Sequence, residues 1–200
     1  MIKKPLISYL FTKFDKIDSL NNFKKNYLKH DSGHIHDLLI CFKLFKEEDL
    51  RVVKENLKEL DYIPFIDEET KNDYDFGSYK RIAEKYNDRD IFFLNSHSYP
   101  VSHEWLRKLM KFYNKYTLIG TSASNESIID SVILKKKYKI LSYLLKKIKY
   151  LRKFKAFPNP HIRTSSFLIN AKIFLDFIDK KKIISKEHTW EIESGKNNLT

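Results

Sequence analysis

Apolar residues follow two different spacings along the chain, and the two spacings predict strands and helices in alternation. Short apolar runs of strand length occupy residues 37–43, 62–66, 91–94, 116–123 and 163–169. Between these runs, apolar residues recur every three or four positions, as on one face of a helix. The helical segments are residues 19–30, 47–60, 78–86, 103–113 and 171–178. Strands alternating with helices predict right-handed βαβ units, and therefore an α/β fold with a mostly parallel sheet and flanking helices.

The composition of the first two predicted strands indicates their positions in the sheet. Residues 1–30 mix aromatic residues with lysine and are interpreted without a strand, so we expect the first strand at residues 37–43. This run is apolar on both faces, as in a central parallel strand. In the second run, Pro64 lacks a backbone N–H and predicts an edge strand or a strand end. Cys41 lies within the first run, and we interpret it as a buried core thiol rather than a nucleophile.

The composition is that of one globular domain with an excess of positive charge. The chain has 200 residues, of which 42% are hydrophobic, and its 38 basic and 26 acidic residues give a net charge of +12. Such a charge suits anionic partners, namely nucleotide diphosphates, phospholipid headgroups or nucleic acid. A single cysteine favours a reducing compartment, and the sequence has neither a membrane-spanning run nor a secretion signal. We therefore expect a cytoplasmic protein.

Polar clusters lie beyond three successive predicted strands. They occupy residues 73–77, 95–98 and 121–127. In open α/β sheets, ligands bind just beyond the carboxyl ends of the strands, so the clusters predict a binding site there. For residues 121–127, a serine-rich turn that caps the next helix is an equally good interpretation.

The order of elements from Asp73 to Ser98, with the aspartate and glycine loop before a helix and a strand, resembles the nucleotide-binding half of GT-A glycosyltransferases. It is most similar to bacterial enzymes of surface-polysaccharide and lipopolysaccharide biosynthesis. The resemblance covers most of the chain and implies one GT-A-like domain over residues 1–200 that binds a nucleotide-sugar donor. It assigns the donor site to Lys43, Asp75, Gly77, Arg81, Asn95, Ser96, His97 and Arg163.

The metal motif of that family is altered in this sequence. Where the family has Asp-x-Asp, whose carboxylates hold a divalent metal, this chain has Asn95-Ser96-His97. Mg²⁺ and Mn²⁺ favour hard, negatively charged oxygen ligands, which these residues do not supply. We therefore assign no metal ligand and leave open whether a divalent metal takes part.

The resemblance also implies an acceptor side and a catalytic base. It places Ser122, His161 and Trp190 on the acceptor side, with Glu191 and Glu193 as the matching acidic pair. Since side chains alternate along a strand, a strand-like run would put both glutamates on one face. We choose Glu193 as the base of an inverting transfer, with the alternative that both glutamates are solvated residues without a role.

Residues 133–155 combine many lysines with an apolar stripe of period three to four. The pattern predicts a basic amphipathic helix inserted into the GT-A-like domain. Such a helix fits an interfacial membrane helix as well as a surface helix packed on the core. Because the implied acceptor is a growing surface glycan or a lipid-linked sugar, the first interpretation predicts peripheral association with the inner face of an anionic membrane.

Two other functions remain as alternatives. A basic nucleic-acid-binding protein would explain the charge, but it does not require polar clusters after successive strands, so we expect no nucleic-acid partner. A catalytically inactive glycosyltransferase-like partner subunit would explain the architecture without the chemistry. The family continues beyond the position of Thr200, so the resemblance predicts a truncated, split or naturally short member.

Overall fold

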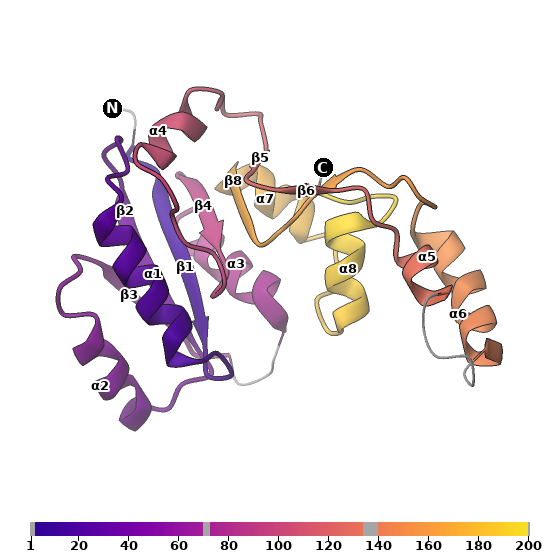
Figure 1. The fold of residues 1–200 in the computed structure, drawn as a ribbon, viewed down its shortest axis with the longest axis horizontal. Helices are drawn as coiled ribbons and strands as arrows, with labels where there is room; N and C mark the ends of the chain where they lie inside the picture. The colour runs from indigo at the N-terminus through magenta and orange to yellow at the C-terminus, as the bar shows by residue number, and fades with distance from the viewer. Residues whose placement is uncertain (1–2, 70–72, 134–139, 200) are drawn as a thin grey trace.

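A computed structural model describes residues 3–69, 73–133 and 140–199. Within them, a six-stranded sheet has the order β3-β2-β1-β4-β8-β5 (Figure 1). Its strands are β1 (Leu6–Thr12), β2 (Asp37–Lys43), β3 (Ile63–Asp67), β4 (Asp90–Leu94), β5 (Ile119–Gly120) and β8 (Ser166–Asn170). Strands β3, β2, β1 and β4 are parallel, and β8 runs antiparallel to its neighbours β4 and β5. The predicted α/β fold with a mostly parallel sheet is confirmed.

The central strand β1 was not predicted, because residues 1–30 were interpreted without a strand. Leu6, Ile7 and Tyr9 are fully buried, and β1 pairs with β2 on one side and with β4 on the other. The first strand is therefore β1, and residues 37–43 form the second. The edge position predicted from Pro64 is confirmed, since β3 pairs with β2 alone.

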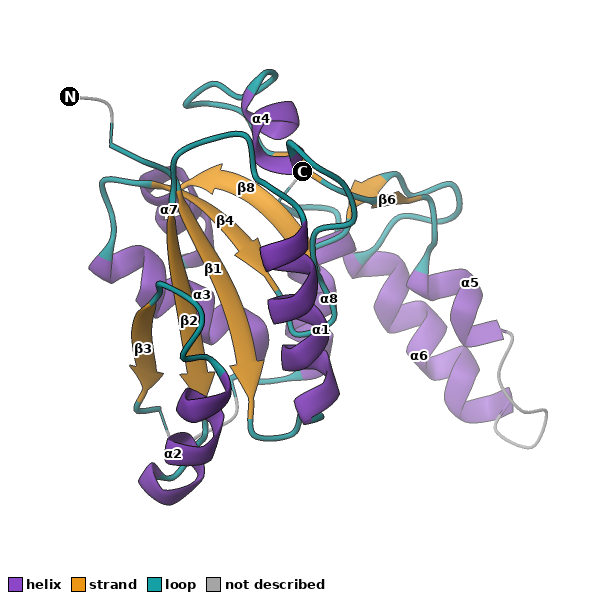
Figure 2. Cartoon of the chain, turned by 60° about the vertical axis from the view of Figure 1, so that its left-hand side comes forward, coloured by secondary structure: helices purple, strands orange, loops and turns teal. Residues whose placement is uncertain are grey.

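Helices cover both faces of the sheet (Figure 2). One core cluster includes residues of α1 (Ile17–Lys29), α2 (Glu47–Asn56) and α4 (Trp105–Met110). The other includes residues of α3 (Tyr74–Lys85), α7 (Ala171–Ile178) and α8 (Lys186–Ser194). Cys41 belongs to the second cluster and is fully buried, as predicted, and burial raises the pKa of its thiol far above the ordinary value.

Three predicted boundaries are wrong. Residues 73–77 are not a loop, because α3 already begins at Tyr74. The strand predicted at residues 116–123 is reduced to β5, after which the chain leaves the sheet and forms β6 (Ala123–Ser124) with β7 (His161–Ile162). Arg163 does not begin a strand, since it lies between β7 and β8.

The basic segment forms a helical hairpin with the residues before it. The hairpin consists of α5 (Ile128–Ile133) and α6 (Ile140–Lys153), and it extends from the sheet beyond α8 (Figure 1). Residues 134–139, which belong to the helix predicted at 133–155, lie outside the described residues. In the described part of the chain, none of the helices has both the length and the apolarity needed to cross a bilayer.

Candidate functional site

The strand order reverses between β1 and β4. From β1 the chain proceeds to β2 and β3 on one side of the sheet, then returns to place β4 on the other side of β1. Loops that leave neighbouring parallel strands in opposite directions open a crevice at the carboxyl ends of the strands, which is the usual ligand site of such sheets. The loop after β1, residues 13–16, and the first residues of the loop after β4, 95–98, therefore form the candidate site.

Asp15 joins these two loops. Its Oδ2 accepts hydrogen bonds from the backbone N–H of Thr12 at 2.7 Å and from the Thr12 hydroxyl at 2.8 Å. Its Oδ1 accepts from the hydroxyl of Ser96 at 2.7 Å, and Tyr9 donates its hydroxyl to the Ser96 carbonyl at 3.0 Å. The sequence interpretation missed Asp15, because it did not recognise β1. The sequence does contain a signal for it, since Asp15 closely follows the apolar run at residues 6–11.

The predicted motif Asn95-Ser96-His97 lies in the loop after β4, and its polar atoms mainly shape that loop. The side-chain oxygen of Asn95 accepts from the backbone N–H of His97 at 3.1 Å and lies 2.9 Å from the hydroxyl of Ser98. Ser96 is buried, whereas His97 is exposed. His97 is therefore the member of the motif whose side chain is open to a ligand.

This motif does not fit a divalent metal. The Asn95 oxygen, which would be a ligand, already accepts from a backbone N–H, and the Ser96 hydroxyl donates to Asp15. Among the described residues, no group of three or more His, Cys, Asp or Glu side chains is arranged to hold a metal ion.

Asp75 lies in the first turn of α3, among charges that come from four other elements. Burial raises the pKa of its carboxyl, and the negative charges of Asp15 and Glu193 raise it further, against the opposite effects of Lys43 and His97. The fold thus brings together charged groups that the sequence places far apart. A partly buried carboxyl whose pKa is raised in this way is a candidate functional group.

Lys43 and Arg81, both predicted to bind the donor, instead form an ion-pair network beside the site. Lys43 is 1% exposed, pairs with Asp73 and donates to the carbonyl of Tyr74 at 2.6 Å. Arg81 binds both oxygens of Asp67, at 2.7 and 2.6 Å, and donates to Asp73 at 2.6 Å. Burial disfavours the ionised form of Asp73, but the hydrogen bonds from Arg81 and Lys43 outweigh it and lower the pKa of Asp73.

Gly77, also predicted in the donor site, has a packing role. A Cβ at this position would lie 1.8 Å from the carboxyl carbon of Asp73. Only a glycine therefore allows the Asp73 carboxylate to rest on the first turn of α3, where it reaches Lys43 and Arg81. The network in turn fixes the start of the helix that carries Asp75.

The strand-like run predicted around Glu191 and Glu193 is wrong, since both residues belong to the helix α8. Residues two apart on a helix point about 200° apart, so the two carboxylates face different sides. Glu191 pairs with Lys153 of α6. Glu193 acts on Asp75 electrostatically, and its Oε1 lies 3.4 Å from the backbone nitrogen of Thr164. The fold therefore separates the predicted pair and brings Glu193 alone to the site.

Of the predicted acceptor residues, Ser122 directly precedes β6, and His161 belongs to β7. The carbonyl of Ser122 accepts from the backbone N–H of Arg163 at 3.0 Å, and the Arg163 side chain binds Glu126 at 2.6 Å. His161 is buried, with Nδ1 2.7 Å from the carbonyl of Asn159. A surface hollow is lined by Ala123, Ser124, Asn125, Pro160, His161 and Ile162.

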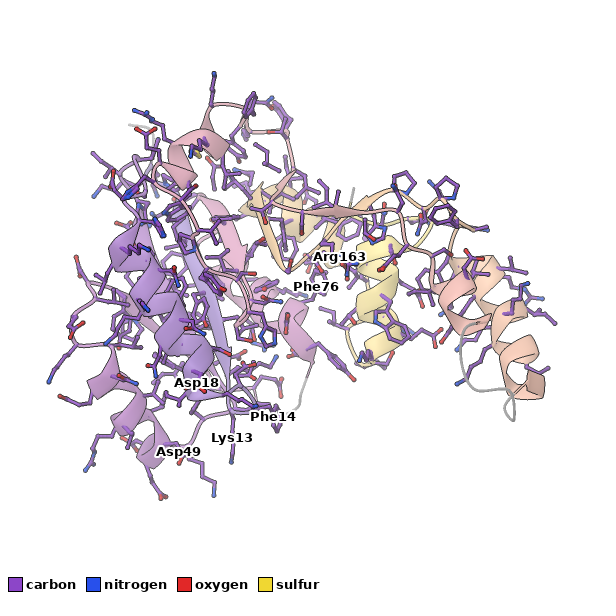
Figure 3. All side chains as sticks on the ribbon, viewed as in Figure 1. Lys13, Phe14, Asp18, Asp49, Phe76 and Arg163 are labelled. Atoms are coloured by element: carbon purple, nitrogen blue, oxygen red, sulfur yellow. The ribbon has the colours of Figure 1, made fainter. Side chains whose placement is uncertain are left out.

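Arg163 and Trp190 differ in exposure and in packing. In the view of Figure 3, Arg163 projects onto the region between the sheet and α8, whereas Lys13 and Phe14 lie below, after the end of β1. The Arg163 side chain is 44% exposed, and its partner Glu126 is 77% exposed, so a stronger anion can replace that partner. Trp190 is half-buried and packs against the hairpin core of Ile129, Tyr150 and Phe154.

Comparison with known proteins finds a likeness of shape and none of sequence. No family model matches the sequence, and no curated protein matches it. The structure is similar to the X-ray structure of the mannosyltransferase Ktr4p from S. cerevisiae, with 11% sequence identity and a TM-score of 0.45. The match covers 90% of this chain and 58% of that one. At this identity and this TM-score, residue roles do not transfer between the two chains.

Proposed function

We propose that this chain is a glycosyltransferase that binds a nucleotide-sugar donor at the carboxyl ends of β1 and β4. The observation that carries the proposal is the reversal of strand order at β1 and β4, where Ser96 and Asp15 join the two loops and burial raises the pKa of the nearby Asp75 carboxyl. A crevice of this kind accommodates a nucleotide. That the nucleotide carries a sugar is inferred from the sequence resemblance to GT-A enzymes.

The donor would lie with its base or ribose toward Asp75 and its diphosphate toward His97 and Arg163. Asp75 is a hydrogen-bond acceptor suited to ribose hydroxyls or base N–H groups. Arg163 offers a planar guanidinium that binds a phosphate with two hydrogen bonds, and Glu126, its present partner, is mostly exposed. Lys43 is committed to Asp73, so it supports the start of α3 rather than contacting the diphosphate.

Glu193 would act as the base of an inverting transfer. The acceptor hydroxyl oxygen attacks the anomeric carbon and forms the new carbon–oxygen bond, while the bond from that carbon to the phosphate oxygen breaks. The electron pair of the broken bond leaves with the nucleoside diphosphate, and the hydroxyl proton passes to the Glu193 carboxylate. Support comes from the position of Glu193, which shares the electrostatic environment of Asp75, whereas Glu191 pairs with Lys153.

The nature of the acceptor rests on the sequence resemblance alone. It favours a growing cell-surface glycan or a lipid-linked sugar, received on the side of Ser122, His161 and Trp190. Ser122 directly precedes β6, His161 belongs to β7, and Trp190 belongs to α8, the helix that carries the proposed base.

Calorimetric titration with UDP-, GDP-, CMP- and dTDP-sugars tests the proposal. We expect one class of nucleotide to bind, and the Asp15→Asn variant to bind it more weakly than the wild type. Asp49→Asn, which removes an exposed carboxylate on α2, is the matched control and should bind normally. Failure of every sugar nucleotide to bind the folded chain would refute the donor site. Donor binding without transfer to any glycan acceptor would instead favour the inactive partner subunit.

A further inference from the structure

Helix α6 exposes an apolar surface that no other described element covers. Leu145 is 66% exposed, Ile148 58% and Leu151 46%. At about 100° per residue, these three side chains span an arc of about 120° on one side of the helix. We call these three residues the apolar arc of α6. Neighbouring exposed aliphatic side chains are typical of surfaces that bind a protein partner or a membrane.

The rotation of α6 about its axis is fixed by its other side. Tyr150 and Phe154 are 7% and 1% exposed, and they pack with Ile129 of α5 and Trp190 of α8. Lys153 binds Glu187 at 3.0 Å and also pairs with Glu191, which ties α6 to α8. The apolar arc therefore points away from the rest of the hairpin, at the end of the molecule remote from the sheet (Figure 1).

Positive charge surrounds the apolar arc. On the helical wheel, Arg152 lies within the arc, while Lys147 and Lys149 lie at its two borders. Residues 140–153 contain no acidic side chain. Lys147 and Arg152 form no ion pair within the described part of the chain, whereas Lys149 pairs with Glu187 at 2.8 Å. The surface is thus apolar at its centre and cationic at its rim.

We propose that α6 docks this surface on an anionic lipid bilayer. The apolar arc would enter the boundary between headgroups and acyl chains, while the lysine and arginine side chains extend to the lipid phosphates. Each basic residue near such a leaflet adds to the attraction. A second copy of this chain would bring the same cationic rim against itself, and nucleic acid would leave the aliphatic side chains unburied. The inference is independent of the glycosyltransferase proposal, since it uses no residue of the donor site.

Vesicle co-sedimentation of the full chain tests this docking. We expect binding to vesicles of phosphatidylglycerol mixed with phosphatidylcholine, little binding to phosphatidylcholine alone, and weaker binding at high salt. Ile148→Asp, in the apolar arc, should lower the partition coefficient about 10- to 100-fold, because it removes a large apolar side chain and adds a negative charge. Its control is Val52→Asp on α2, where Val52 is 72% exposed.

A charge-matched pair separates docking by α6 from general attraction to a basic protein. Arg152→Glu should lower the partition coefficient about 5- to 30-fold. Arg51→Glu makes an equal change of charge at an exposed position on α2, and it should change the partition coefficient by less than about twofold. Equal binding to neutral and anionic vesicles, equal losses in test and control variants, or no binding would overturn the proposal. So would self-association that Ile148→Asp abolishes in the absence of vesicle binding, because a second copy would then cover the arc.

Discussion

The hydroxyl of Ser96 donates a hydrogen bond to Asp15 at 2.7 Å, although the two residues are 81 positions apart in the sequence. This bond connects the loops that follow β4 and β1, at the point where the strand order reverses. It therefore holds the two walls of the candidate site at a fixed separation. Asp75, at the start of α3, feels the charge of Asp15 across the same site.

Replacing Asp75 by Asn should weaken donor binding without weakening the fold. Burial and the neighbouring acids raise the folded-state pKa of Asp75. A carboxyl with a raised pKa favours folding at pH values below its unfolded-state pKa, and this contribution is lost as the pH rises through the folded-state value. At neutral pH the ionised group therefore opposes folding, and Asn should leave the stability to urea unchanged or higher.

The same Asp75→Asn variant should lose donor affinity about 10- to 100-fold in calorimetry, because a hydrogen bond to a charged group is lost. Asp18→Asn, which changes an exposed acid on α1, should alter neither quantity. Lower stability of Asp75→Asn together with normal donor binding would make Asp75 a structural residue.

Replacing Glu193 by Gln should lower turnover by about 10²- to 10⁴-fold, because the amide keeps the shape of the side chain but cannot take the proton. Donor affinity should stay within about twofold of the wild type, since Glu193 acts on the acceptor. Glu191→Gln is the matched control and should retain transfer, because Glu191 pairs with Lys153. Transfer that depends on Glu191 and not on Glu193 would refute the assignment.

Donor binding should survive chelation of divalent metals. The side-chain oxygen of Asn95 and the hydroxyl of Ser96 already form hydrogen bonds within the protein. The altered motif therefore supplies few free ligand atoms for a metal. We expect the dissociation constant measured with EDTA to change by less than about threefold on addition of excess Mn²⁺. Arg163→Ala should weaken binding about tenfold in both conditions. A large gain in affinity with Mn²⁺ would show that other residues hold an ion.

The effect of Gly77→Ala should change sign with its background. In the wild type the new Cβ would displace the Asp73 carboxylate, leave buried Lys43 without its partner, and cost about 3 kcal/mol of stability. In a Lys43→Met, Asp73→Ala background neither charge is present. There the same substitution should stabilise by up to about 1 kcal/mol, because alanine favours a helix more than glycine does. Urea unfolding of the four chains measures both values, and equal effects in the two backgrounds would contradict the role of Gly77.

Several elements of the fold follow from the local pattern of the sequence. The patterns predict a strand at residues 37–43 and a helix at residues 171–178, and β2 and α7 have these bounds. Each is determined by neighbours along the chain, namely a continuous apolar run and a period of three to four. The pattern fails at residues 186–194, where Ser185 caps a helix by accepting from the backbone N–H of His188 at 3.3 Å. A serine at the start of a helix is a recognised capping signal in a sequence. The interpretation instead followed the alternation of Glu191 and Glu193, which is typical of a strand.

Which side of an element faces which partner was decided by the tertiary structure. The sequence identifies Lys43 as a basic residue at a strand end, yet only Asp73, 30 positions away, commits it to a buried pair. Likewise, apolar residues recur every three or four positions in residues 133–155 and predict a single apolar stripe along the helix. In the fold, Phe154 is buried against α5 and α8, whereas Leu145 and Ile148 stay exposed. A local period establishes that a helix has an apolar side, but packing partners distant in sequence determine which part of that side is covered.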